Sequence, residues 1–220
     1  MKRHILALLL VASAVSGFGQ KHIKLSFTGS PAINWMSTNN TVVESGNPIF
    51  GYDFGVNADF YFAEHERYSF LTGLLVTNAG GELSYQNGSD FKFAGETLPA
   101  SSTIKYKLRY VEIPLCLKLK TSQFNRISYW GQLGITTMVN IDSKGFSDDG
   151  TLDKSDIKDE INLLNLDMNV GIGFDFDLSG NNSVTTGIIF QNGLMDVTTD
   201  NEFTDKTIIN SLKLKIGVNF

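Results

Sequence analysis

The sequence predicts an all-β protein whose strands close into an eight-stranded antiparallel up-and-down β-barrel. Eight separate segments alternate apolar residues with polar or small ones, which is the two-residue period of a β-strand. Each segment approaches the length of about 9–11 residues that crosses a hydrocarbon layer with tilt. The connections are alternately short and long. An even number of strands joined in this way can close into a barrel with both termini at one end.

The first four strands are expected between residues 22 and 120. The first begins at residue 22 and carries Ile23, Leu25 and Phe27 on one face. The second, residues 50–62, is among the most regular, with seven consecutive apolar positions of one parity. The third is expected at residues 68–76 and the fourth at residues 105–120, where apolar and polar side chains again alternate.

The last four strands are expected in the second half of the chain. The fifth, residues 129–141, alternates from Tyr129 to Ile141. The sixth, residues 166–178, is as regular as the second, and its opposite face carries only Asp, Asn and Gly. The seventh is shorter, residues 184–190, and the eighth is residues 212–220. Strict alternation in each segment indicates a sheet whose two faces meet different environments.

The fourth strand contains a change of parity. Tyr106, Leu108 and Tyr110 share one parity, whereas the apolar residues from Val111 onward have the other. A shift of one residue predicts a β-bulge at this point, with Tyr106 on the apolar outer face. Pro114 cannot donate a backbone hydrogen bond, so we expect irregular pairing beside it.

The length of the connections indicates which kind of barrel this is. Residues 38–48, 78–104, 142–162 and 195–207 are long and polar, whereas residues 63–67, 121–127 and 179–182 are short. An up-and-down barrel places all the long loops at one end and all the short turns, with both termini, at the other. This asymmetry is typical of barrels in an outer membrane. We expect residues 78–104 to extend their flanking strands as a hairpin above the membrane.

The polar face decides the orientation of the side chains. In a soluble ligand carrier the outside would be rich in Lys, Glu and Arg. Here the polar face is rich in Gly, Asn, Asp, Ser and Thr, which are small enough to fill a narrow lumen, and its charges have both signs. We therefore expect the apolar face to contact lipid and the charges to pair inside the barrel. The expected lumenal charges are Asp53, Asp59, Lys105, Lys107, Arg109, Glu112, Lys118, Asp167, Asp175, Asp177, Lys213 and Lys215.

Aromatic residues on the apolar face are expected to form two belts at the membrane surfaces. The lower belt, near the short turns, would contain Phe62, Tyr68, Tyr129, Phe176 and Phe220, and the upper belt Trp35, Phe50, Tyr106 and Phe190.

The N-terminus has the features of an export signal. Lys2 and Arg3 precede an apolar run at residues 5–15, and small residues follow. The run is too short for a membrane-spanning helix, which needs about 20 residues. We expect residues 1–19 to be a cleaved signal peptide and residues 20–220 to form the barrel. The single Cys116 allows no intramolecular disulfide and is expected to be a buried, unreactive thiol.

Residues 108–118, Leu-Arg-Tyr-Val-Glu-Ile-Pro-Leu-Cys-Leu-Lys, resemble the tyrosine–hydrophobic–glutamate–isoleucine–proline–leucine strand of a family of small outer-membrane β-barrel domains that includes PorT-like proteins. The glycine-bearing strands at 130–134 and 170–173, the segment 191–194 and the final Phe220 fit the same family. The resemblance spans the mature chain. It implies an eight-stranded barrel in the outer membrane, with Phe220 as the residue by which the assembly machinery recognises the last strand.

The sequence offers little catalytic chemistry. Enzymatic barrels of this size commonly use a His beside Ser, Asp or Glu. His4 lies in the signal peptide, and His22 and His65 lie at the end of the barrel with the short turns, away from the outer leaflet. Asp175 and Asp177 share a face, but lumenal ion pairing explains them. No phosphate-binding glycine loop and no zinc spacing occurs, so we expect no enzyme activity, cofactor or metal.

Composition limits the partners. The chain is 42% hydrophobic and 19% charged, with a net charge of −5 that argues against nucleic acid. We expect contacts with outer-membrane lipid, lipopolysaccharide and the assembly machinery, and with an unidentified protein at the loops. Acidic loop 142–162 has no regular calcium-binding spacing. The favoured hypothesis is a structural or interaction protein whose lumen is filled by polar side chains. The alternatives are a narrow channel or secretion component, and a soluble periplasmic ligand-binding barrel.

Overall fold

The computed structural model describes residues 23–39, 42–62, 67–179, 182–199 and 206–220. Eight long strands form the barrel: β1 (Ile23–Thr38), β3 (Ile49–Tyr61), β4 (Tyr68–Gln86), β7 (Ser101–Lys120), β8 (Ile127–Ser147), β10 (Leu164–Ser179), β11 (Asn182–Gly193) and β12 (Thr207–Asn219). Shorter elements lie in the connections: β2 (Val43–Ser45), β5 (Phe91–Phe93), β6 (Glu96–Leu98), β9 (Asp153–Asp156) and the 3-10 helix η2 (Lys158–Glu160). All eight expected strands are confirmed.

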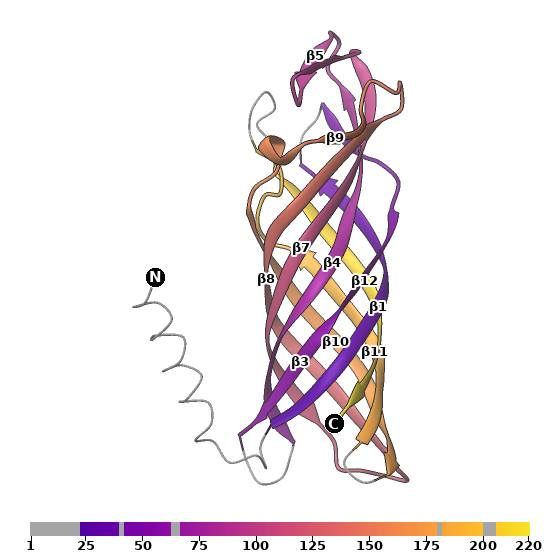
Figure 1. The fold of residues 1–220 in the computed structure, drawn as a ribbon, viewed down its shortest axis with the longest axis vertical. Helices are drawn as coiled ribbons and strands as arrows, with labels where there is room; N and C mark the ends of the chain where they lie inside the picture. The colour runs from indigo at the N-terminus through magenta and orange to yellow at the C-terminus, as the bar shows by residue number, and fades with distance from the viewer. Residues whose placement is uncertain (1–22, 40–41, 63–66, 180–181, 200–205) are drawn as a thin grey trace, which may run out of the picture.

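Each long strand pairs antiparallel with the next long strand in the sequence, and one further pairing, between the last strand and the first, closes the cylinder. β12 pairs with β1, and β10 pairs with β8 across the acidic connection. The start of β1 and the end of β12 lie at the end of the barrel that carries the short connections (Figure 1). The backbone N–H of Phe220 donates to Leu25 O at 2.9 Å, which holds the C-terminus on β1. The result is the predicted up-and-down barrel.

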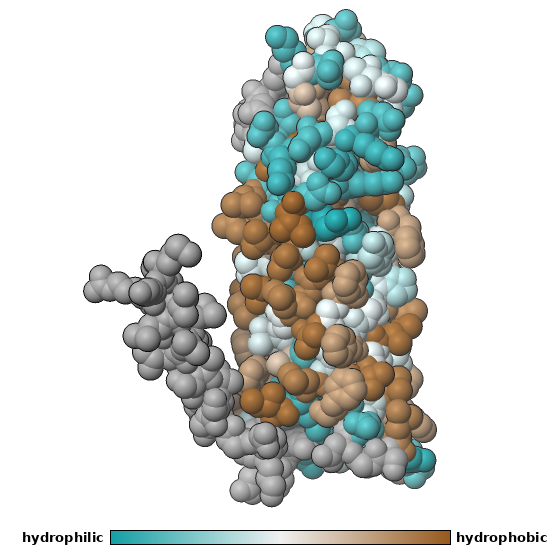
Figure 2. All heavy atoms as spheres, viewed as in Figure 1, coloured by the Kyte–Doolittle hydropathy of each residue, from teal (hydrophilic) through white to brown (hydrophobic). Residues whose placement is uncertain are grey.

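The outside of the barrel carries a broad hydrophobic belt (Figure 2). It is built from the alternate apolar positions of all eight strands, and Phe54 and Ile172 are 54% and 68% exposed within it. A contiguous apolar surface of this extent cannot face water in a monomer, because such patches on soluble proteins rarely exceed a few hundred Å². The predicted direction of the apolar face is therefore confirmed. The described residues contain no helix long and apolar enough to cross a bilayer.

Three strands continue beyond the belt at the end with the long loops. β4, β7 and β8 have 19, 20 and 21 residues, against 13 in β3 and β12. In this extension β2 pairs with β4 and β9 pairs with β8, giving a sheet of order β2-β4-β7-β8-β9. The β5–β6 hairpin forms the tip (Figure 1). Its two-residue turn, Ala94-Gly95, has positive φ at both positions, which is the hairpin geometry that favours glycine. The expected hairpin at residues 78–104 is confirmed.

The extension has a hydrophobic core of its own inside the sheet. Eighteen buried residues form it: Met36, Val43, Ala79, Leu83, Tyr85, Phe91, Phe93, Leu98, Ile104, Tyr106, Leu108, Tyr110, Met138, Leu152, Ile157, Ile161, Val197 and Ile209. β4 and β7 thus exchange their polar and apolar faces where they leave the membrane. On β4, the outward side changes from Val76 to Asn78, while the inward side changes from Thr77 to Ala79 and Leu83.

The same exchange corrects the interpretation of β7. The strand has no bulge of its own: its even-numbered residues point inward from Ser102 to Lys118. The bulge lies on β8. Arg109 of β7 pairs with Asp142 and the next residue, Tyr110, pairs with Asn140, so Ile141 of β8 has no partner on β7. The apolar residues of β7 change parity because the surroundings of its two faces change at the membrane surface. In the membrane the outer face meets lipid, whereas in the extension it meets water and the inner face meets the hydrophobic core. Tyr106 is therefore fully buried, and its predicted place in the outer belt is wrong. Irregular pairing beside Pro114 is found as expected, since the β4–β7 register is interrupted between Leu71 and Leu75.

Candidate functional site

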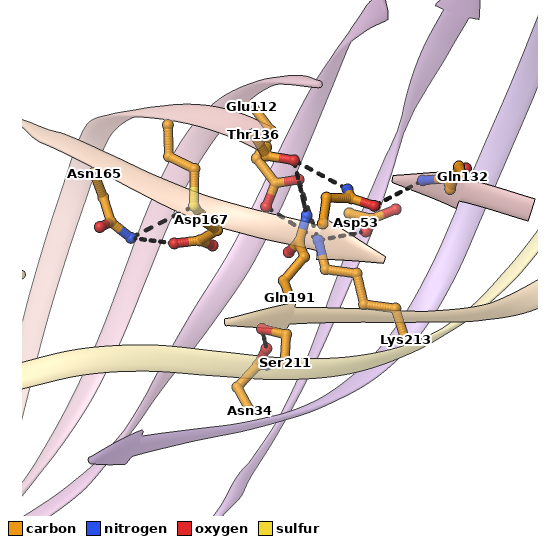
Figure 3. Close-up of polar contacts among 12 residues, drawn as sticks. Asn34, Asp53, Glu112, Gln132, Thr136, Asn165, Asp167, Gln191, Ser211 and Lys213 are labelled. Carbon is orange, nitrogen blue, oxygen red and sulfur yellow. Dashed lines mark hydrogen bonds and ion pairs between the residues drawn. The ribbon is translucent and has the colours of Figure 1, made fainter. Parts of the chain in front are cut away.

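A network of ion pairs and hydrogen bonds crosses the middle of the lumen. Lys213 on β12 lies at its centre, with Nζ 2.9 Å from Asp53 Oδ2 and 3.0 and 3.1 Å from the two carboxylate oxygens of Glu112. The three residues come from β3, β7 and β12, so the contacts span the barrel (Figure 3). All three are buried. Burial of charge is costly unless each group is paired and hydrogen-bonded, and here each charge has an opposite partner.

Amides and a hydroxyl extend this network to the opposite wall. Gln191 Nε2 donates to Glu112 Oε2 at 3.4 Å and to Thr136 Oγ1 at 3.4 Å. Asn169 Nδ2 donates to the same Thr136 hydroxyl at 3.0 Å, and Gln132 Nε2 donates to Asn169 Oδ1 at 2.8 Å (Figure 3). A cavity of about 30 Å³ remains beside Lys213 and Gln132. This volume accommodates one or two water molecules.

A second group of charges lies nearer the short turns. Lys118 Nζ is 2.8 Å from Asp59 Oδ2, and Lys120 Nζ is 2.8 Å from Asp175 Oδ2. Ser69 Oγ donates to Asp59 Oδ1 at 3.3 Å. These contacts join β3, β4, β7 and β10, so the lower lumen is also bridged by paired charges.

An inward-facing tryptophan fills the space between two of the lysines. The Trp130 ring is buried, and the amino groups of Lys118 and Lys215 each lie 5.5 Å from its centroid, which is cation–π distance. Gly173 and Gly187 face this ring, and a Cβ on either would overlap it. The missing side chains of β10 and β11 therefore make room for the indole.

The structure brings most of the predicted lumenal charges together but not all of them. Eight are buried inside the barrel: Asp53, Asp59, Glu112, Lys118, Asp167, Asp175, Lys213 and Lys215. Asp167 accepts a hydrogen bond from Asn165 Nδ2 at 2.9 Å. Asp177 is half-buried and lines an open pocket at the short-turn end beside Arg67 and Lys120.

Three predicted members lie outside the barrel. Lys105, Lys107 and Arg109 point outward, because β7 keeps its parity and these residues stand above the hydrophobic belt. Lys105 pairs there with Glu82 at 2.9 Å and is 40% exposed. The prediction that these three charges lie in the lumen is wrong.

The aromatic residues of the predicted belts face outward, apart from Tyr106. Phe62, Tyr68, Tyr129, Phe176 and Phe220 are exposed around the short-turn end, and Phe50 is 74% exposed at the other. Trp35 stacks on Phe190 with ring centroids 6.3 Å apart, and Phe220 meets Phe27 edge-on. The signal peptide, its cleavage site, His4, His22 and His65 lie outside the described residues.

Sequence reasoning missed the uncharged half of the network. Trp130, Gln132, Thr136, Asn169 and Gln191 were not singled out, although each lies at an inward position of its strand. The parity of β8, β10 and β11 was the available signal, since it places these residues opposite the lipid-facing set.

A model of the family described as outer membrane protein beta-barrel domain matches residues 17–216. The chain belongs to this family. It is an outer-membrane protein, which agrees with its lipid-facing belt and with the location that the sequence predicts. No curated protein matches the sequence.

Solved structures with a similar fold are small outer-membrane barrels. Neisserial surface protein A (NspA) superposes with a TM-score of 0.51 at 12% identity, covering 89% of this chain and 95% of that one. OprG from Pseudomonas aeruginosa gives a TM-score of 0.42 at 11% identity, covering 90% and 94%. Ail from Yersinia pestis gives 0.39 at 12%, covering 90% and 99%. At such identity the NspA match supports the fold alone.

Proposed function

We propose that this family member is a non-enzymatic, non-conducting outer-membrane protein that holds an extracellular platform on a filled barrel. The proposal rests on two layers that follow one another along the barrel axis and that would each block the passage of ions. Paired charges and amides span the lumen within the membrane, and the apolar core of the extension lies above them. An interaction role at the loops follows, because the remaining large surface of the protein is the extension.

The lower barrier opposes ion passage by its pairing. An ion entering the lumen would have to separate Lys213 from Glu112 and Asp53, or Lys118 from Asp59, in a buried environment. Breaking one partner from a buried pair costs about 3–5 kcal/mol. An eight-stranded barrel is also just wide enough for its own side chains, so no parallel route is left around them.

The upper barrier is apolar and continuous with the extracellular sheet. Tyr106, Leu108 and Tyr110 of β7 are fully buried in it, together with Leu83 of β4. The hydroxyl groups of Tyr85 and Tyr106 contact each other within the core. Apart from the tyrosine hydroxyl groups, this layer is apolar, so it offers too few ligands to replace the hydration shell of an ion.

The extension is the surface offered to partners. The β5–β6 hairpin packs Phe91 and Phe93 into the core through Tyr85 and Tyr106, with ring centroids 5.3–6.2 Å apart. These contacts hold the tip on the sheet, so a partner would meet an ordered surface. An ordered surface binds at a lower entropic cost than a disordered loop.

Planar-bilayer recording tests the proposal. The purified protein should insert without discrete conductance steps at moderate voltage, and heat-modifiable migration should verify that it is folded. The matched variant weakens both barriers. It removes the tip, residues 88–100, replaces Tyr106 and Leu108 by Ser, and carries K213M/D53N/E112Q in the lumen. At the same voltage the variant should conduct, whereas the wild type should show no conductance steps. Reproducible steps from the folded wild type would instead establish a narrow channel.

A further inference from the structure

Five basic side chains gather on the outer wall just above the hydrophobic belt. Lys105, Lys107, Arg109, Lys144 and Lys154 line an open groove of about 620 Å³ together with Phe50, Tyr52 and Phe146. Hydrophilic side chains cover this upper part of the face, and the hydrophobic belt begins directly beneath them (Figure 2). The groove faces away from the lumen, so whatever occupies it approaches from the membrane or from outside the cell.

The register of the sheet fixes the height of the groove. One cross-strand row contains Tyr52, Asn78, Arg109 and Asp142, and the next outward row toward the membrane contains Phe54, Val76, Val111 and Val139. Successive outward residues on a strand are about 7 Å apart. Arg109 therefore lies only one outward position along β7 from Val111, whose row of side chains contacts hydrocarbon. This is the depth of lipid headgroups.

The positive charge of the groove is only partly neutralised by the protein. Lys105 pairs with Glu82, and Lys144 lies 3.8 Å from Asp142 and 4.0 Å from Asp156. Within the described ranges, no carboxylate lies in ion-pairing distance of Lys107, Arg109 or Lys154. Arg109 donates its Nε to Asn78 Oδ1 at 3.2 Å, and its guanidinium makes no other side-chain hydrogen bond within the part of the chain that the structure describes. The forked face of the guanidinium is available to an anion.

Two of these cations oppose each other directly. Lys107 on β7 and Lys144 on β8 are register partners, and the Lys107 amino group lies 4.7 Å above the Phe146 ring. Like charges directly opposite in an antiparallel pair are destabilising. An anion between the two lysines would remove this repulsion and accept hydrogen bonds from both.

We propose that the groove binds the phosphate groups of a phosphorylated glycolipid of the outer leaflet. The acyl chains of this lipid lie along Phe54, Val76 and Val111, while Arg109 and Lys107 hold a phosphate from the side. Arginine matches phosphate with two parallel hydrogen bonds, and lysine adds a point charge. The rings of Phe50 and Tyr52 flank the site at the depth that aromatic side chains prefer. The site is independent of whether the lumen conducts.

Binding to lipid A tests this proposal. The folded protein in detergent is titrated with bis-phosphorylated lipid A and with chemically dephosphorylated lipid A, and bound lipid is counted by native mass spectrometry. We expect the phosphorylated form to bind at least about tenfold more tightly, and the double variant K107Q/R109Q to lose at least about tenfold in affinity. The pair K107R/R109K keeps both charges but moves the forked guanidinium from position 109 to position 107, so it should bind more tightly than K107Q/R109Q.

The matched control is K92Q/K158Q, which also removes two positive charges from exposed positions of the extension. It should bind lipid A like the wild type. Equal binding of the two lipid A forms, or undiminished binding by K107Q/R109Q, would overturn the proposal, as would an equal loss in the control. Phosphatidylglycerol and inorganic phosphate serve as competitors. Displacement of lipid A by either at equal concentration would show that the groove does not select a glycolipid.

Discussion

The amino group of Lys213 lies 3.0 and 3.1 Å from the two carboxylate oxygens of Glu112, on the far side of the lumen. The two residues are 101 positions apart in the chain. Their contact ties β7 to β12, which are not neighbours in the sheet. We infer that this contact braces the wall of the barrel from inside.

Replacing Lys213 by Met should strongly destabilise the protein. The change leaves Glu112 and Asp53 facing each other without a cation, and removal of one partner from a buried pair costs about 3–5 kcal/mol. Urea unfolding in lipid vesicles, followed by heat-modifiable migration, measures the free energy of unfolding. The triple variant K213M/D53N/E112Q should recover much of the loss. If K213M unfolds like the exposed-site control K92M, the network has no bracing role.

Substituting Gly187 by Ala should destabilise the barrel by about 1–3 kcal/mol, the usual cost of overpacking. The added methyl would overlap the Trp130 ring and the β10 backbone. Gly131→Ala is the matched control, because the nearest atom to a Cβ there is 3.9 Å away. Trp130 fluorescence should change in G187A and remain unchanged in G131A. Equal stabilities of the two variants would show that the glycines do not shape the indole site.

The thiol of Cys116 should be unreactive in the folded barrel. It points into the lumen and is fully buried. A water-soluble maleimide should label it only after boiling in detergent, whereas Cys at position 124 in a C116S background should react at once, since Phe124 is 74% exposed. Rapid labelling of native Cys116 would reveal a lumen that is open to water and would contradict the proposed filled barrel.

Removal of the terminal Phe220 should impair insertion. Its ring packs edge-on against Phe27 and its backbone N–H is bonded to β1, so the last strand loses its anchor at the closing seam. Membrane fractionation of cells expressing the truncated chain should show less heat-modifiable protein than the wild type. Phe220→Trp keeps an aromatic ring and should insert normally.

The sequence pattern was enough to predict the strand order and the lipid-facing side. Along each strand segment inside the membrane, one face meets lipid throughout and the other meets the polar lumen. The pattern failed on the part of β7 that precedes Val111, residues 105–110. Hydrophobicity alternation reports the surroundings of a face, and both surroundings invert at the membrane surface, so an inversion and a bulge leave the same pattern in residues 105–120. The bulge at Ile141 lies on the partner strand, where apolar Val139 and Ile141 alternate with polar Asn140 and Asp142 as in a regular strand, so the pattern gives no sign of it.

The lumenal partners could be expected only as a set. Parity places Asp53, Glu112 and Lys213 inside, but which charges meet depends on the stagger of eight strands, and a shift of two residues in any pairing preserves parity while changing every contact. The role of Trp130 was hidden for the same reason, because the glycines that receive it lie on two other strands.

Spin-label accessibility along β7 tests most directly whether this strand exchanges its polar and apolar faces without a change of parity. Labels at residues 104–117 of the protein in vesicles are compared for collisions with oxygen, which partitions into lipid, and with a water-soluble nickel chelate. Odd positions should favour nickel from 105 to 109 and oxygen from 111 to 117, while even positions should be shielded from both. A shift of the accessible positions to even numbers between 106 and 110, with oxygen favoured there, would contradict this exchange of faces.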